Sequence, residues 1–223
     1  DSFKEIEEAA HEIFAAEAAP LAFGGDGNIT LPILRAAHKF YPNLVVLHVD
    51  AHTDTYRGDG NQDYMRYNVA TTFTRAAEEG LIDTKASLHI GPRGPTMDNS
   101  VFEHTRDVGF QLIDGEDLFE IGLLKTADNL VEQLKDRTVY LCFDMDFFDP
   151  SCAPGVCTPT WGGATAREGL GFLRKLKGLN IVGADINTVS PPHDVGGMTA
   201  FLASAVALEI LTLFCHAQNL VRK

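Results

Sequence analysis

The sequence predicts an α/β domain built on a mainly parallel sheet. Five short runs rich in Val, Ile and Leu alternate with longer segments of helical periodicity, an alternation typical of strand–helix units. The runs are continuously apolar rather than alternating in polarity, as expected of strands covered on both faces. The chain has 223 residues, no internal repeat and no linker rich in Pro, Gly or Ser, so we expect one domain over residues 1–223.

The predicted elements follow one another along the chain. The strands are Pro20–Phe23, Leu44–Val49, Ala86–Gly91, Thr138–Phe143 and Asn180–Ile186. The helices are Ser2–Glu17, Ile29–Phe40, Val69–Glu79, Gly122–Leu134, Thr165–Leu176 and Gly197–Gln218. In open α/β sheets ligands bind outside the carboxyl ends of the strands, so the residues that follow each strand are the first candidates for a site.

Composition narrows the class of protein. The formal net charge of −13 argues against nucleic acid or an anionic membrane as partner and favours cationic ligands or metal ions. We find no apolar run of the roughly 18–20 residues that would span a bilayer, and the acidic start does not resemble a signal peptide. Cys142, Cys152, Cys157 and Cys215 form no C-x-x-C pair, which indicates a reduced, cytoplasmic protein, with a Cys152–Cys157 bridge as the alternative.

Two acidic clusters follow two of the predicted strands. Asp50, His52 and Asp54 come after one strand, and Asp144 and Asp146 come after another. In extended backbone, alternate residues point to one face, so each cluster is expected to present its side chains together. A single Asp after a strand is commonly a cap or a turn former, but so many adjacent carboxylates are costly unless a cation neutralises them. Carboxylate and imidazole ligands together suit Mn, Ni, Fe, Co or Zn.

These clusters carry a family resemblance. The segments "GGDG", "DAHTD" and "DMDFFDP" resemble the signature segments of the ureohydrolases, the arginase and agmatinase family. The segments "FTRAAEEGLID", "HIGPRG" and "SPPHD" resemble its agmatinase-like branch, and the longer segment "SPPHDVGGMTAF" resembles guanidine- and metformin-hydrolase-type relatives. The resemblance covers nearly the whole chain but not the family's N-terminal segment. It implies a three-layer α/β/α sandwich that assembles into trimers or hexamers.

The resemblance also implies a reaction and a set of ligands. Family members hydrolyse a small cationic guanidino compound to urea and an amine, using two Mn ions, or Ni in some members, to activate water. By this match, Asp50 and Asp144 bridge the two ions, and His52 and Asp146 complete the second ion. Asp54 binds the first ion and is the one catalytic candidate.

Three positions depart from the family pattern. Gly27 stands where the family has a His that binds the first ion. Val69 stands where a His contacts substrate and moves protons, and Thr188 stands where a Glu holds the guanidinium. Together these departures predict a degraded active site that holds one ion or two.

Histidines elsewhere offer an alternative in which the site is restored. His193 follows a double Pro on a loop and is the candidate replacement. His48 and His89 are further candidates, although the place of His48 within a strand favours a packed core histidine.

The sequence therefore leaves three functions open. The first is a ureohydrolase-family subunit, weakly active or non-catalytic, that partners an identical or homologous subunit. The second is an active Mn- or Ni-dependent amidinohydrolase with a rearranged site. The third is a non-enzymatic binder of guanidino compounds, and a one-metal deacetylase-like hydrolase is a more distant alternative.

Overall fold

Parallel strands form one sheet at the centre of the computed structural model, which describes residues 2–58 and 63–220. Among these residues the strand order is β1-β6-β5-β2-β3-β4. The strands are β1 (Leu21–Phe23), β2 (Val45–Val49), β3 (Leu88–Ile90), β4 (Gln111–Ile113), β5 (Thr138–Asp144) and β6 (Asn180–Asn187). Because every pairing is parallel, the carboxyl ends of all these strands lie at one edge of the sheet.

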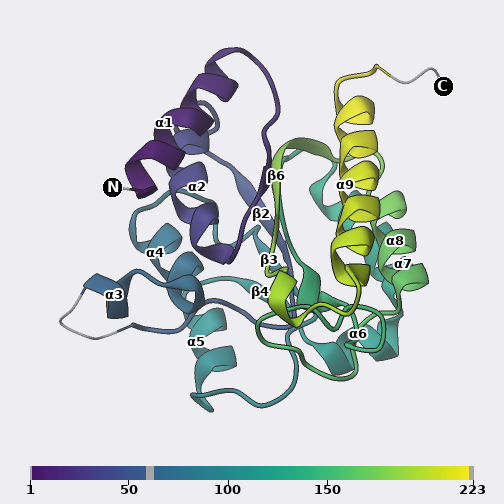
Figure 1. Ribbon diagram of the computed structural model, residues 1–223. Helices are drawn as coiled ribbons and strands as arrows, with labels where there is room; N and C mark the ends of the chain where they lie inside the picture. Colours follow the sequence, from purple (N-terminus) through teal and green to yellow (C-terminus); the bar gives the residue numbers. More distant parts are fainter. Residues whose placement is uncertain (1, 59–62, 221–223) are drawn as a thin grey trace.

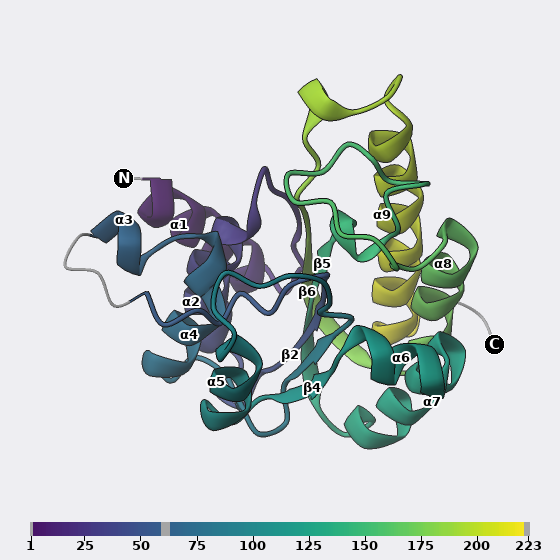
Figure 2. The same cartoon turned by 90° about the horizontal axis from the view of Figure 1, so that it is seen from below.

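Helices cover both faces of this sheet, which confirms the three-layer α/β/α prediction (Figures 1 and 2). One layer contains α1 (Ser2–Ala15), α2 (Thr30–His38) and α4 (Thr72–Glu78). The other contains α6 (Gly115–Ile121), α7 (Leu123–Leu134), α8 (Ala166–Lys175) and α9 (Met198–Ala217). The shorter helices α3 (Asp63–Arg66) and α5 (Val101–Asp107) lie in the connections after β2 and β3.

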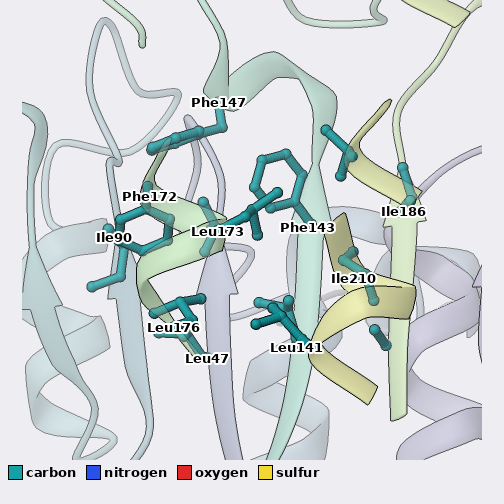
Figure 3. Packing of buried hydrophobic residues seen from close by; sticks show 14 of the residues in the cluster. Leu47, Ile90, Leu141, Phe143, Phe147, Phe172, Leu173, Leu176, Ile186 and Ile210 are labelled. Atoms are coloured by element: carbon teal, nitrogen blue, oxygen red, sulfur yellow. The ribbon is translucent and has the colours of Figure 1, made fainter. Parts of the chain in front are cut away.

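The core consists of two apolar clusters, one on each face of the sheet. Leu141 of β5 packs with Phe172 of α8 and Ile210 of α9 on one face (Figure 3). Val46 of β2 packs with Leu34 of α2 on the other. In β2, and in β5 from Val139 onward, successive residues face opposite sides of the sheet and all are buried, which is why these two strand sequences are largely apolar.

Sequence periodicity missed the shortest elements. β4 has three residues and begins with a polar Gln111, and α3, α5 and α6 have seven residues or fewer, so none spans enough positions to show a period. The helix predicted to begin at Val69 instead starts with a 3₁₀ turn, Val69–Thr71, capped by the Asn68 side chain. The other predicted helix ends agree within about two residues.

The length of α9 corrects one expectation. Contrary to the statement that no apolar run could span a bilayer, its 20 residues are long and apolar enough to do so by length and composition. This is a weak indication, because core helices of globular proteins meet the same test. In this fold α9 packs along β6 and α8, with Ala203, Val206 and Ile210 buried against the sheet.

Leu141 offers a test of this core. It is fully buried at the centre of β5, so Leu141→Ala should lower the free energy of unfolding by about 2–5 kcal/mol. The matched control is Leu124→Ala on α7, where the side chain is 50% exposed and the change should be within about 0.5 kcal/mol. Urea unfolding followed by circular dichroism measures both, and equal losses for the two variants would contradict the packing described.

Candidate metal centre

The sheet brings the two acidic clusters together at its carboxyl edge. Val49, the last residue of β2, pairs with Phe143 of β5, so Asp50 and Asp144 follow at the same level on neighbouring strands. On its other side, Asp144 pairs with Asn187 at the end of β6. Chain connectivity makes this edge a crossover point, because β5 and β6 lie between β1 and β2. Ligands bind at such points in α/β sheets.

Turns, rather than extended strands, aim the side chains, and this corrects the expected geometry. β2 ends at Val49, and Asp54 adopts a left-handed conformation with φ 50°. β5 ends at Asp144, and Asp146 lies on the 3₁₀ turn Met145–Phe147. The backbone amide of Ala51 donates to Asp146 Oδ1 at 3.3 Å, which links the two turns.

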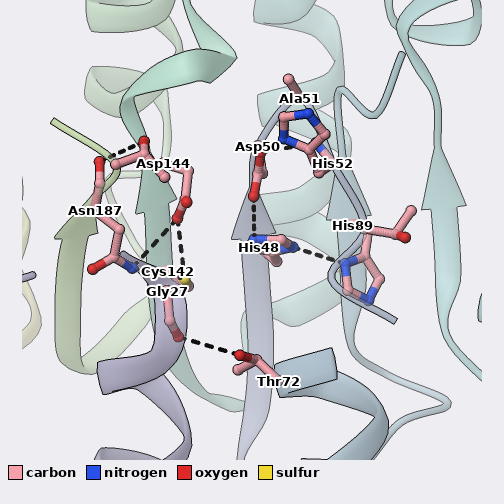
Figure 4. Close-up of polar contacts among 12 residues, drawn as sticks. Gly27, His48, Asp50, Ala51, His52, Thr72, His89, Cys142, Asp144 and Asn187 are labelled. Atoms are coloured by element: carbon pink, nitrogen blue, oxygen red, sulfur yellow. Dashed lines mark hydrogen bonds and ion pairs between the residues drawn. The ribbon is translucent and has the colours of Figure 1, made fainter. Parts of the chain in front are cut away.

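Two groups of potential ligands share one carboxylate. Asp50, His52 and Asp146 each place a ligand atom within 4.8 Å of the others, and so do His48, Asp50 and Asp54. His52 Nδ1 lies 3.2 Å from Asp50 Oδ1 and 3.5 Å from Asp146 Oδ2. Figure 4 shows Asp50 between the rings of His52 and His48. Asp50 is therefore placed to bridge two cation positions.

Asp144 belongs to a further group beside these. Asp144, His48 and Cys142 also place ligand atoms within 4.8 Å of one another. Asp144 accepts hydrogen bonds from Asn187 Nδ2 at 3.3 Å and from Cys142 Sγ at 3.7 Å. The five predicted ligands thus converge at one edge of the sheet, and their four carboxylates are all buried.

Burial and mutual repulsion raise the pKa of these carboxyl groups. Burial first, and the charge of Asp50 second, raise the pKa of Asp54 and Asp144 well above the usual range. The same causes raise the pKa of Asp146 to about 7, although His52 opposes them. Burial alone would lower the pKa of His52, but its contacts with Asp146 and Asp50 outweigh burial and raise it to about 11. The carboxyl groups are thus costly to ionise together unless a cation neutralises them.

Two of the positions that depart from the family pattern, Gly27 and Val69, lie beside Asp54 of this cluster. A Cβ at Gly27 would stand 3.3 Å from both Asp54 Oδ2 and Val69 Cγ2. A His side chain at position 27 would therefore extend beside Asp54, where the resemblance expects the first ion. Val69 begins its 3₁₀ turn at the same place and offers only methyl groups. Asp26 of "GGDG" instead caps the following turn by accepting from the Asn28 amide at 3.0 Å.

Thr188 is held tightly by backbone groups. Its hydroxyl donates to the Asn187 carbonyl at 2.7 Å and accepts from the Met145 amide at 2.9 Å. Its φ is 71°, a left-handed conformation that a β-branched residue rarely adopts. Such strain persists at functional sites when the surroundings impose it. The hydroxyl stabilises the turn between Asp144 and Asp146. Because Thr has no carboxylate, this position cannot form an ion pair with a cationic substrate.

The three histidines considered as replacements, His193, His48 and His89, differ in their surroundings. His193 is exposed and its Nδ1 pairs with Ser190 Oγ at 2.7 Å, and no potential ligand group among the described residues includes it. His48 and His89 are buried on neighbouring strands, with 2.8 Å between their Nδ1 atoms. Burial lowers the pKa of His48 to about 3, so its ring is neutral.

Residues outside the motifs support the cluster. Asn187 Nδ2 donates to Asp144 and, at 2.8 Å, to the buried Asp185. In the sequence both residues stand close to Thr188, but neither occupies the position where the family has its Glu. Their signal was polar side chains at the end of a strand that is otherwise apolar. The four cysteines are all free, so the alternative Cys152–Cys157 bridge is absent here.

Arg93 is a supporting residue that sequence reasoning did not single out. Its guanidinium donates to the carbonyl oxygens of Asp146 at 2.9 Å, Thr160 at 2.8 Å and Trp161 at 3.2 Å. One side chain thus joins the loop after β3 to the turn that carries Asp146. The available signal was an Arg that stands three residues after the end of a buried strand.

Fold and site together define an α/β protein with a carboxylate–histidine centre at the carboxyl edge of its sheet. Residues 1–213 match the arginase family. The chain is 38% identical over 212 residues to the mitochondrial guanidino acid hydrolase of Homo sapiens, covering 95% of this chain and 59% of that protein. It is 38% identical over 220 residues to the guanidinopropionase of Pseudomonas aeruginosa, covering 97% of this chain and 67% of that protein.

Comparison with solved structures supports the same family. The proclavaminate amidino hydrolase of Streptomyces clavuligerus superimposes with a TM-score of 0.89 at 35% identity, over 96% of this chain and 70% of that one. The chain therefore belongs to the arginase family, the ureohydrolases, in its agmatinase-like branch. It spans 59% of the length of the human relative.

The residues present fit a divalent ion at one of the two positions. Asp50, His52 and Asp146, with Asp144 beside them, supply carboxylate and imidazole donors and are buried or half-buried. The other position has Asp50 and Asp54 but no side chain at Gly27. Burial and neighbouring negative charge raise the pKa of Asp54 and Asp146, and a bound cation would offset both causes.

We predict that the metal-free protein loses stability as pH rises. The folded-state pKa of Asp146 is raised to about 7 from 3.8, so folding retains a proton that the unfolded chain has released. Stability from such a raised pKa is complete below the unfolded value and is lost as pH rises through the folded value. The unfolding temperature should fall between about pH 5 and about pH 8, by roughly 2–4 °C for each kcal/mol.

The control for this experiment is Asp146→Asn, which removes one of the titrating groups and should flatten the slope. Differential scanning calorimetry of chelator-treated protein measures both variants. An unfolding temperature that rises over the same pH range would show that the carboxyl cluster does not hold extra protons.

Proposed function

We propose that this chain is a metal-binding subunit of a urea-releasing guanidino-group hydrolase and that its own turnover is weak. The observation that carries the proposal is the set of four buried Asp side chains and His52 at the carboxyl ends of β2 and β5. The names of the relatives support a substrate with a guanidino or amidino group. Mn or Ni fits the donor set, as one ion or two.

The chain's own residues account for the first part of the activity. Asp50, His52, Asp144 and Asp146 would hold an ion, and the negative cluster would attract a cationic guanidinium. Divalent ions in such sites lower the pKa of water, so that it attacks at neutral pH. Asp54 belongs to the group with His48 and Asp50, so its carboxylate could accept a proton or coordinate an ion.

The remaining steps lack their side chains. Val69 has no group that transfers a proton, and the Thr188 hydroxyl is occupied by the Met145 amide and the Asn187 carbonyl. Losing a ligand and a transition-state contact together costs several kcal/mol, about 10³-fold or more in rate. A homologous subunit with a complete site would supply the main activity.

The surface of α9 supports assembly with such a subunit, in a trimer or hexamer. Phe201, Leu208 and Leu211 lie on its outer side and are 72%, 65% and 47% exposed. Large apolar side chains gathered on one exposed face commonly mark interaction surfaces. Symmetric assemblies accept a homologous chain that keeps the interface while its site changes.

Urea release measures the proposed weakness directly. With saturating Mn or Ni, the unchanged chain should release urea from agmatine or 3-guanidinopropionate slowly. The triple variant Gly27→His, Val69→His, Thr188→Glu should be faster by about 10³-fold or more, because it restores a ligand, a proton carrier and a substrate contact.

Two controls accompany this assay. Adding Asp146→Asn to the triple variant should abolish the gain by removing a ligand from the other ion. The unchanged chain should also be assayed with a catalytically complete homologue, whose activity it should support. Fast urea release by the unchanged chain alone would overturn the proposal of weak activity.

One observation favours the active-enzyme alternative. His48 has an imidazole nitrogen within 4.8 Å of the Asp50 and Asp54 oxygens. The ion position that lacks a histidine at Gly27 therefore still has a nitrogen ligand within reach. The guanidino-binding alternative has less support, because Thr188 offers no carboxylate to a bound guanidinium.

A further inference from the structure

We propose that His48 supplies the imidazole for a second divalent ion, held by His48 Nε2 with Asp50 and Asp54, in place of the missing side chain at Gly27. This inference rests on the proposed metal-binding function and adds a ligand to it. The observations are a group of three ligand atoms, an unpartnered ring nitrogen and a distance that suits coordination.

His48 Nε2 is a buried polar atom with no hydrogen-bond partner among residues 2–58 and 63–220. It lies 3.0 Å from Asp50 Oδ2, but that contact lacks the geometry of a hydrogen bond. The His48 side chain is 1% exposed, so water does not replace the missing partner. A buried nitrogen without a partner is costly, and a cation held between it and the carboxylates would remove that cost.

The distances suit two donors on one ion. Nitrogen and oxygen ligands lie about 2.0–2.2 Å from ions such as Zn²⁺, so neighbouring donors at right angles stand roughly 3 Å apart. The 3.0 Å between His48 Nε2 and Asp50 Oδ2 matches this value. Asp54 completes the group within 4.8 Å. Because Asp50 also belongs to the group with His52 and Asp146, it would bridge the two ions.

The other ring nitrogen already has a partner that orients the ring. His48 Nδ1 lies 2.8 Å from His89 Nδ1 across the β2–β3 pairing (Figure 4). A proton on His48 Nδ1, donated to His89, leaves the lone pair of Nε2 directed at the cluster. Metal-binding histidines commonly donate their second N–H to a neighbouring group in this way.

The direct test detects the couplings in the unchanged chain and uses variants only to assign them. Protein with ¹⁵N-labelled histidine is stripped with a chelator, loaded with ¹¹³Cd²⁺ and measured by NMR. We expect ¹⁵N–¹¹³Cd couplings to two rings, assigned as His52 and His48 from the spectra of His52→Gln and His48→Phe. Coupling to His52 alone would overturn the inference and leave the proposed function standing. Absence of any bound Cd²⁺ would overturn both.

Matched variants measure ion content per chain by elemental analysis after dialysis against Mn²⁺. His48→Phe keeps the ring and removes both nitrogens, so it should lose one of two ions. His38→Phe makes the same change at a histidine that belongs to none of the ligand groups among the described residues and pairs with the Leu81 carbonyl, so it should keep two ions. Adding Gly27→His to His48→Phe should restore the lost ion. If His48→Phe and His38→Phe bind equal numbers of ions, His48 is not a ligand.

Discussion

Four carboxylates buried at one edge of a sheet form the constraint on which this structure depends. Asp50, Asp144 and Asp146 are each about 1% exposed, and Asp54 is 7% exposed. Charged groups removed from water in this way need protons or cations. Burial and mutual repulsion raise the pKa of Asp54, Asp144 and Asp146 accordingly. A scaffold that gathers these groups suits a bound cation.

Apart from the contacts of His52 with Asp50 and Asp146, backbone groups and neutral side chains hold most of the cluster. Asn187 binds Asp144, Thr188 braces the Met145 amide, and Arg93 binds the carbonyl of Asp146 rather than its carboxylate. The carboxylate oxygens therefore keep capacity to bind an ion. The left-handed conformations of Asp54 and Thr188 are strain that this arrangement maintains.

Sequence reasoning recovered the layers, most of the long elements and the acidic residues that gather at the sheet edge, because hydrophobic periodicity and strand-end carboxylates are local signals. It placed Asp54 and Asp146 on extended strands, although turns aim both, since a left-handed residue and a 3₁₀ turn leave little trace in sequence. It could not decide the role of His48. The pairing with His89 and the unpartnered Nε2 arise only when β2 and β3 lie side by side.

Anomalous diffraction from crystals grown with Mn²⁺ tests the central claim most directly, because it locates ions without any substitution. We predict an anomalous peak bounded by Asp50, His52 and Asp146, whose ligand atoms lie within 4.8 Å of one another. A map with no peak within coordination distance of Asp50 would contradict the claim that these buried carboxylates form a metal centre.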